Sequence, residues 1–164
     1  MSEHFNNIEF DTADISRKVS FEINDIDVSI VNALRRIIKS DIPHVGFMGE
    51  GDDCSVNVLE NTGSLHNEYL QHRIGMIPIM FTKEEIDTFP DHSYKFVLKV
   101  KNTGHDMLNV TTHDFTGTKD DVALTKVDID RLFPLHPISK SPILITRLQM
   151  NQEIHIECEP VIST

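Results

Sequence analysis

The sequence predicts an α+β fold, in which a few helices accompany a mainly β chain. Three observations carry this prediction: a strongly amphipathic stretch at residues 30–38, a short helical stretch at residues 65–74, and several strand-like stretches after residue 93. At 164 residues the chain suffices for one domain, or for two small ones that share a core. Its apolar content of 39% is low for a self-sufficient globule, so part of its apolar surface is expected to need a partner.

The first helix is expected to run to about Ser40, because Pro43 forbids its continuation and Asp25 or Asp27 can cap its start. Its apolar residues follow the i, i+3, i+4, i+7, i+8 spacing of one helix face, which Val31 widens: Ile30, Ala33, Leu34, Ile37 and Ile38. The opposite face carries polar side chains: Ser29, Asn32, Arg36 and Lys39. Arg35 lies at the edge of the apolar stripe, although a basic pair on a helix is by itself most often a solvated face.

The second helix is expected from about residue 65 to residue 74. Side-chain oxygens can cap its start (Asn61, Thr62 and Ser64), and Gly75 and Pro78 are expected to end it, the first as a residue that tolerates a left-handed conformation. Leu70 and Ile74 share one side, while Leu65, Tyr69 and His72 share another. Glu68 lies one turn before His72, a spacing that permits a charged hydrogen bond. Spacing alone favours an ordinary surface helix with solvated polar side chains.

The rest of the chain is expected to be mainly β. Apolar and lysine residues alternate over Tyr94–Lys101, and residues 102–104 provide a turn into a strand at residues 107–112, which predicts a hairpin. Residues 115–121 are predicted to be a loop. A second hairpin is predicted from residues 143–148 and Glu153–Cys158, which flank a polar connection. Three prolines indicate an irregular surface segment at residues 132–142: Pro134, Pro137 and Pro142.

Charge and cysteine content exclude several classes of function. With 15 Lys plus Arg against 26 Asp plus Glu, the net charge is −11, which disfavours direct binding to nucleic acid or anionic membranes. No window reaches the length of a membrane-spanning helix, and a signal-peptide pattern is absent, so a soluble compartment is expected. Cys54 and Cys158 are too few for a disulfide framework or a metal site and are predicted to be reduced thiols. No cofactor is expected.

Three patterns resemble catalytic sites, and none of them is convincing. Asp128 and Asp130 have the D-x-D spacing of some metal-dependent enzymes, which leaves a metal-dependent hydrolase as a last-ranked hypothesis beside an acidic loop with capping aspartates. The glycines of residues 46–51 lack a following G-K-[ST] and have acidic neighbours that would repel a phosphate. His66 and His72 are six residues apart and do not form a ligand pair on a helix. No enzymatic activity is expected from the chain.

Residues 61–79, which read N-T-G-S-L-H-N-E-Y-L-Q-H-R-I-G-M-I-P-I, resemble the N-[TS]-S-x-L-x-[DN]-E-[FY]-[IL]-x-H-R-[IL]-G-[LM]-I-P-[IL] signature of alpha/D-type assembly subunits of DNA-directed RNA polymerases. The matching residues are Glu68, Tyr69, His72, Arg73, Gly75 and Pro78. Residues 21–43 resemble the D-x-S-x-x-N-x-L-R-R helix of that family, and residues 143–158 resemble its strand pair, with Gln152 as the matching glutamine. The wording of residues 65–79 is also similar to versions carried by large cytoplasmic DNA viruses.

The resemblance implies a non-catalytic subunit that docks a smaller alpha-like partner and contacts the large catalytic subunits. It implies that residues 1–45 are the N-terminal half of a split dimerisation domain and that residues 46–164 are an inserted, mainly β, α+β domain. Partner contacts are implied for one helix: Ile30, Asn32, Leu34, Arg35, Arg36 and Ile37. Glu68, His72 and Arg73 would brace the insert.

In the family, the segment resembling residues 159–164 continues through a G-x-[GA]-K-x-H-A-[KR]-[WF] stretch into the second half of the dimerisation domain. The chain is therefore expected to be a fragment of a longer subunit or one half of a split one. A different class of function stays open: a stand-alone acidic module that binds polymerase subunits as a regulator or decoy. The expected location is the nucleus or cytoplasm, or the host cytoplasm or virion if the source is viral.

Overall fold

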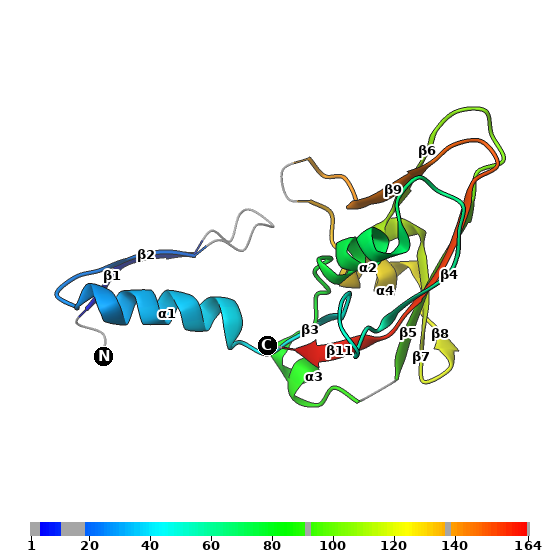
Figure 1. The fold of residues 1–164 in the computed structure, drawn as a ribbon. Helices are drawn as coiled ribbons and strands as arrows, with labels where there is room; N and C mark the ends of the chain where they lie inside the picture. Colours follow the sequence, from blue (N-terminus) through cyan, green and yellow to red (C-terminus); the bar gives the residue numbers. More distant parts are fainter. Residues whose placement is uncertain (1–3, 11–18, 91–92, 137–138, 164) are drawn as a thin grey trace. The chain divides into compact units, whose positions relative to one another are not determined.

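The computed structural model describes residues 4–10, 19–90, 93–136 and 139–163, and these form two separate units (Figure 1). Unit 1 is built on residues up to Pro43, and unit 2 on His44–His136 and Lys140–Ser163. The chain passes from one unit to the other between Pro43 and His44, at the proline that was expected to stop the first helix.

Unit 1 consists of two strands and the long helix. Strand β1 (Phe5–Phe10) pairs antiparallel with β2 (Val19–Ile23), and the rings of Phe5 and Phe21 lie 5.7 Å apart between centroids. Helix α1 (Val28–Ser40) begins at Asp27, whose Oδ1 accepts a hydrogen bond from the Ser29 backbone at 2.8 Å. Hydrogen bonding to the Ser29 side chain, and then to the Ser29 backbone, lowers the pKa of the Asp27 carboxyl. The predicted helix, its cap and its end are confirmed.

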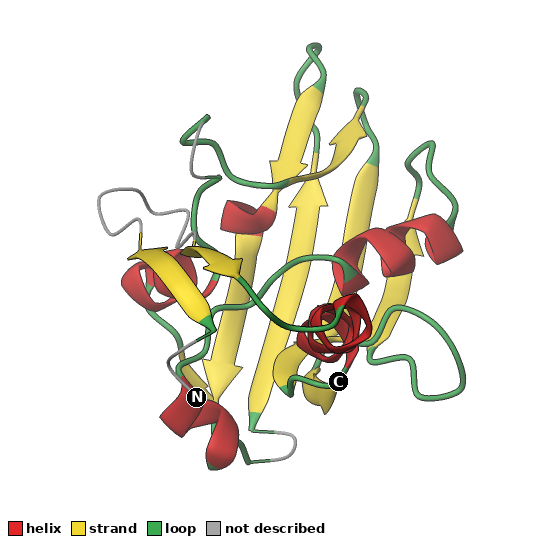
Figure 2. Cartoon of the chain, turned by 90° about the vertical axis from the view of Figure 1, so that its left-hand side faces the viewer, coloured by secondary structure: helices red, strands yellow, loops and turns green. Residues whose placement is uncertain are grey.

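Unit 2 is organised by a five-stranded antiparallel sheet (Figure 2). Across the sheet the strands are β4 (Val56–Asn61), β10 (Glu153–Cys158), β5 (Tyr94–Lys101), β7 (Phe115–Lys119) and β8 (Val122–Ala123). Two further antiparallel pairs complete the unit: β3 (His44–Phe47) with β11 (Pro160–Ser163), and β6 (Leu108–Thr111) with β9 (Leu144–Leu148).

Helices α2 (Asn67–Gly75) and α4 (Lys126–Leu132) cover one face of this sheet, and α3 (Lys83–Asp87) precedes β5 (Figure 1). A single 3₁₀ turn, η1 (Thr112–Asp114), links β6 to β7. The core forms where alternate residues of the strands meet the inner faces of the helices, which bury Leu70, Ile74, Ile129 and Leu132. Four aromatic side chains pack together at its centre: Phe47, Phe96, Phe115 and Phe133.

Strand pairing differs from both predicted hairpins. Strand β5 pairs with β10 and β7, and the strand that follows it, β6, pairs with β9. Strands β9 and β10 follow each other through a tight turn but pair with different partners. The two hairpin predictions are therefore wrong, because turn chemistry shows where the chain reverses and does not show which strand lies next to which.

The loop predicted at residues 115–121 is also wrong, because residues 115–119 form β7 inside the sheet. The inward position 117 is a glycine, so the apolar alternation that marks a strand is interrupted there. A Cβ on Gly117 would lie 2.9 Å from the Phe96 ring, so the large side chain on β5 fills the space above it.

The irregular segment predicted from the prolines has no regular element at residues 133–136 and 139–143, and Pro137 lies outside the described residues. Every helix in the described part of the chain falls short of the length and apolar character that a membrane span requires.

Candidate functional site

The clearest candidate for a binding surface is the apolar face of α1. None of the thirteen described residues of this helix is buried. Ile30, Ile37 and Ile38 expose 59%, 49% and 50% of their surface, while Leu34 is half-buried. Water-exposed isoleucine side chains in one stripe leave apolar area that a partner can cover, each contributing roughly 1.5–3 kcal/mol when fully buried. We name this stripe (Ile30, Leu34, Ile37 and Ile38) the α1 face.

The polar neighbours of the α1 face are held by the helix itself. The Arg35 guanidinium donates from Nε and Nη2 to Asn32 Oδ1, at 3.3 and 3.0 Å. Arg36 is exposed, and its carbonyl accepts a hydrogen bond from Ser40 Oγ at 2.8 Å. These contacts order Arg35 along the helix and leave donors of both guanidinium groups available for a carboxylate on another protein.

Helix α2 is fixed by a close backbone contact at its C-terminal end. A Cβ on Gly49 would lie 2.3 Å from the Gln71 carbonyl oxygen, and one on Gly75 would lie 3.0 Å from the Gly49 backbone nitrogen. Two glycines are thus needed for the helix to touch the segment that follows β3. The expected left-handed role of Gly75 is wrong: the residue lies inside α2 without a positive φ and is required for its small size.

The start of α2 is built differently from the prediction. His66 is the N-cap residue, and it makes no side-chain capping bond. Asn61 instead ties the preceding loop together: its Nδ2 donates to the Leu65 carbonyl at 2.7 Å and to Asn67 Oδ1 at 2.8 Å. Thr62 bonds to the backbone of Glu153, at the start of β10. The polar residues before the helix therefore organise a loop and hold it to the sheet.

His72 has a different partner from the one predicted. Its Nε2 lies 3.5 Å from Glu50 Oε1, on the turn after β3. Glu68 and Tyr69 are exposed, Tyr69 by 65%, so this side of α2 faces solvent. The bond between Glu68 and His72 that the spacing permits is replaced by the contact with Glu50, which sequence spacing does not reveal.

Arg73 connects α2 to strand β9. Its Nε donates to the Ile145 carbonyl and its Nη2 donates to the Leu144 carbonyl, both at 2.9 Å. Two bonds from a charged group to backbone oxygens order both elements. Pro78 is exposed beyond the helix end.

Gln152 closes the turn between β9 and β10, where its Oε1 accepts a bond from the Gln149 backbone at 2.7 Å. Beside it, Asn102 is buried, and its Nδ2 donates to the carbonyls of Asp106 and Leu148 at 2.8 and 2.9 Å. Asn102 thus joins the end of β5 to the loop that follows it and to the end of β9. The sequence indicated only a turn at this position, since an asparagine before Thr-Gly is typical of turns of every kind.

Asp128 and Asp130 lie on α4, and the structure gives both of them structural partners. Asp128 completes a capping box with Thr125, and hydrogen bonds from Thr125 lower the pKa of its carboxyl. Asp130 lies 3.4 Å from Lys126 Nζ and 3.7 Å from His113 Nε2. Residues two apart on a helix point in different directions, so the strand arrangement that the metal hypothesis requires is contradicted. Among the described residues, no group of side chains has the arrangement of a metal site.

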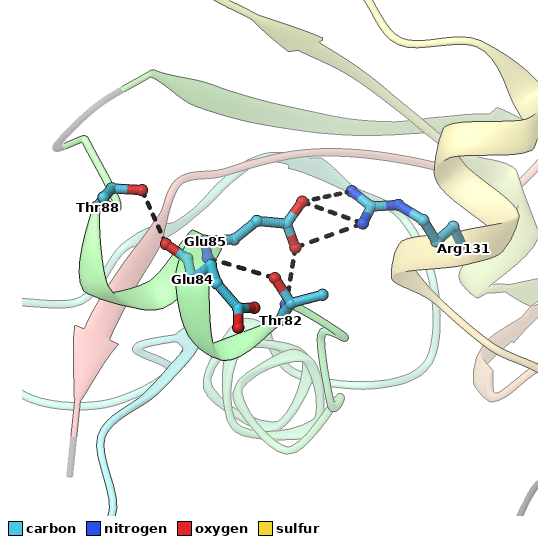
Figure 3. A network of polar contacts seen from close by, with 5 residues as sticks. All are labelled: Thr82, Glu84, Glu85, Thr88 and Arg131. Carbon is cyan, nitrogen blue, oxygen red and sulfur yellow. Dashed lines mark hydrogen bonds and ion pairs between the residues drawn. The ribbon is translucent and has the colours of Figure 1, made fainter.

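A polar network that the sequence analysis did not predict joins α3 to α4 (Figure 3). Glu85 Oε1 accepts bonds from Arg131 Nη1 and Nη2 at 3.0 and 3.1 Å, and Glu85 Oε2 accepts the Thr82 backbone bond at 2.8 Å. The Thr82 bond is the main cause of the lowered pKa of Glu85, and Arg131 adds to it. The capping box T-x-x-E was readable in the sequence, but the arginine 46 residues away was not.

Both cysteines are free thiols, as predicted. Cys158 is buried, and burial raises the pKa of its thiol, so the thiolate is disfavoured.

The chain matches the family described as the RNA polymerase Rpb3/Rpb11 dimerisation domain over residues 20–153. A conjugation stage-specific protein of Tetrahymena thermophila is 30% identical to it, over 87% of this chain and 49% of the relative. The subunit rpac1 of DNA-directed RNA polymerases I and III from Dictyostelium discoideum is 30% identical, over 87% of this chain and 43% of the relative. Subunit RPB3 of DNA-directed RNA polymerase II from Schizosaccharomyces pombe is 27% identical, over 85% and 48%. The chain thus spans about half the length of these relatives.

Proposed function

This chain belongs to the RNA polymerase Rpb3/Rpb11 dimerisation-domain family, and from that premise we propose that it works as a non-catalytic assembly and dimerisation subunit of a DNA-directed RNA polymerase. Its work would be to position the large catalytic subunits for transcription. No reaction is assigned to the chain itself.

The observation that carries this proposal is the exposed α1 face. Ile30 and Ile37 are both about half exposed or more, and no described residue of their helix is buried. A stripe of this kind costs solubility unless another protein covers it. The family is described by dimerisation, so a smaller alpha-like subunit is the proposed partner at this face.

The polar residues beside the α1 face are proposed to contact a large subunit. Arg35, already ordered by Asn32, and Arg36 would donate charge-assisted bonds to carboxylates of that subunit. The order imposed by Asn32 lowers the entropy cost of binding, because Arg35 need not be immobilised at the moment of contact.

Unit 2 is proposed to be the inserted domain of the family, and unit 1 the N-terminal half of the dimerisation domain, with the boundary near residue 45. The signature residues of α2 would then stabilise the inserted domain through contacts within it. Arg73 supports this through its bonds to β9, and His72 through its contact with Glu50. Glu68 is exposed, and it is left as a contact for solvent or a partner.

The test is to tag the chain in its native setting, purify it under mild salt and identify by mass spectrometry what accompanies it in stoichiometric amount. Two very large polymerase subunits and a small alpha-like protein are expected. The double variant Ile30→Asp/Ile37→Asp should lower recovery of the alpha-like protein by about tenfold or more, since two charges would replace buried anchors.

Leu59→Asp/Val127→Asp is the matched control, because it adds the same two charges at side chains of unit 2 that are 50% and 77% exposed, in β4 and α4. Equal loss of recovery in both variants would mean that added charge, and not the α1 face, disturbs assembly. Recovery of the unsubstituted chain without any polymerase subunit would overturn the assembly proposal.

The alternative function is a stand-alone acidic module that binds polymerase subunits as a regulator or decoy. The net charge of −11 favours it, because an acidic protein suits competition for basic surfaces. Stoichiometric presence in transcriptionally active polymerase would exclude this alternative.

The proposed location is inside the cell, in the nucleus or cytoplasm. A source in a large DNA virus, which the sequence of residues 65–79 suggests, would place the protein in the host cytoplasm or virion. Fractionation of infected and uninfected material followed by detection of the tag would decide between them.

A further inference from the structure

The sheet of unit 2 has an open edge at β8. Strand β8 pairs with β7 through Thr118 with Ala123 and Lys119 with Val122, and the Leu124 nitrogen donates to the Gly117 carbonyl at 2.8 Å. Along a strand, the main-chain groups of successive residues point alternately to its two sides. Val122 and Leu124 therefore direct theirs toward β7, and Ala123 directs its own outward. Within the described residues β8 has no second neighbour. The Val122 side chain is 70% exposed at this edge.

A hollow of about 530 Å³ lies beside the same edge. Tyr94, Leu124 and Leu132 contribute apolar side chains to its lining, and Ala123 also borders it. The Glu85–Arg131 pair forms part of the wall, where three hydrogen bonds from the guanidinium to the carboxylate hold both side chains in place (Figure 3). An apolar side chain on a segment lying along β8 would therefore find a preformed space next to it.

The side chains around the hollow carry more negative than positive charge. Arg131 is paired with Glu85, and Lys119 lies over the Tyr94 ring at 5.2 Å from its centroid. The two residues of the β7–β8 turn, Asp120 and Asp121, have positive φ values of 49° and 62°, and both are exposed. Arg131 and Glu85 offset each other. Lys119 keeps its positive charge over the neutral Tyr94 ring and offsets one carboxylate, whereas three carboxylates lie at this edge: Asp120, Asp121 and Asp128. The charge left at the edge is therefore negative.

From these features we propose that the β8 edge binds an extended basic segment of another protein. The segment would add a strand to β8 through the main chain of Ala123, place an apolar side chain in the hollow, and set a lysine or arginine against Asp120 and Asp121. This goes beyond the assembly role, because it concerns a second surface on unit 2 and does not depend on the α1 face.

The test uses the full chain and a synthetic heptapeptide that alternates lysine and valine, acetylated and amidated at its ends, followed by nitrogen-15 NMR. Addition of the peptide is expected to shift the amide signals of Gly117, Ala123 and Leu124. A peptide with glutamate in place of lysine is expected to leave them unchanged.

Backbone pairing is tested with two N-methylated versions of the lysine–valine peptide. Methylation on the edge that bonds β8 should weaken binding by about tenfold, since it removes main-chain donors, and methylation on the opposite edge should not. Equal affinity of both versions would overturn strand addition.

Two charge variants separate this edge from general attraction to an acidic protein. Asp120→Asn/Asp121→Asn removes the turn carboxylates, and asparagine tolerates the positive φ, so the turn is retained. Asp52→Asn/Asp53→Asn removes the same charge from the turn before β4. Only the Asp120→Asn/Asp121→Asn variant should weaken binding of the lysine–valine peptide, by several-fold. Equal weakening, signal shifts elsewhere on the chain, or concentration-dependent pairing of two copies through β8 would each overturn the proposal.

Discussion

Units 1 and 2 treat the same kinds of side chain in opposite ways. Unit 2 buries its large apolar residues around Phe96 and Leu98, which have no exposed surface. Unit 1 leaves Ile30 and Ile37 about half exposed, and its long helix has no buried residue among those described. The hydrophobicity of the sequence does not distinguish these two cases. An apolar stripe indicates a surface to be buried, but it does not indicate whether the same chain or another protein buries it.

The largest expected effect comes from removing an aromatic ring from unit 2. Phe96 is in contact with Phe47, Phe115 and Phe133, and its truncation leaves a cavity among packed rings. Phe96→Ala should lower the free energy of unfolding of unit 2 by about 3–5 kcal/mol. Ile37→Ala in unit 1 should change stability by less than about 1 kcal/mol.

Hydrogen exchange followed by mass spectrometry is the measurement, because it reports each unit separately. A similar loss of protection from both substitutions would break the contrast between a unit with a core and a unit without one.

A smaller effect is expected where unit 2 packs backbone against backbone. Gly49→Ala places a Cβ 2.3 Å from the Gln71 carbonyl oxygen, and neither atom can move without shifting α2. We expect a loss of about 2–3 kcal/mol in urea unfolding followed by circular dichroism. Gly46→Ala is the control, since the nearest atom would lie 3.6 Å away. An unchanged Gly49→Ala midpoint would show that α2 is free to move.

Two arginines sharpen the comparison further. Arg73 bonds two backbone carbonyls of β9, so Arg73→Ala leaves both oxygens without that donor and should cost unit 2 about 2 kcal/mol. Arg35 bonds only the exposed Asn32 side chain, and Arg35→Ala should cost unit 1 less than about 0.5 kcal/mol. Chemical denaturation of the two variants checks this order, and a larger loss at Arg35 would contradict it.

The smallest effect concerns pH. The pKa of Glu85 is lowered from its ordinary value of 4.5 by the Thr82 backbone bond and by Arg131, so the folded state favours the carboxylate. The stabilisation is present above pH 4.5 and is lost as the pH falls through the lowered value. Glu85→Gln should cost about 1 kcal/mol at neutral pH, and its unfolding curve should depend less on acid than that of the native chain.

Asp27 provides the counterpart in unit 1. Its pKa is lowered by Ser29 alone, and asparagine caps a helix about as well as aspartate, so Asp27→Asn should leave α1 intact at neutral pH. Helicity measured by circular dichroism between pH 2 and neutrality tests both carboxyls: the native chain should lose helicity in acid, and each variant should lose less. The same acid dependence in the native chain and in both variants would contradict the assignment.

The sequence predicted those parts of the fold that depend on near neighbours. Helix α1 was readable because its cap, apolar spacing and terminating proline all lie within one stretch, and β5 because its inward residues alternate. The pairing of β6 with β9 was not readable, since it joins residues more than thirty positions apart. Strand β7 was missed because Gly117 stands where an apolar side chain would mark the inner face.

The candidate site follows the same division. The α1 face was predicted residue by residue from spacing, whereas its partners remain a prediction. His72 with Glu50 and Glu85 with Arg131 bring together residues from different elements, and neither pair has a local signal. Asn102 looked like any turn asparagine, because its importance comes from burial and not from its neighbours in the chain.

The order of strands in the sheet has a consequence for synthesis on the ribosome. Strand β10 lies between β4 and β5, yet it is translated after both, and the bond between Thr62 and Glu153 spans 91 residues. At typical elongation rates, roughly 5–20 s separate the emergence of these two partners. During that time β4 and β5 stand without the strand that joins them, so a translational pause before residue 153 is expected to lower the yield of folded protein.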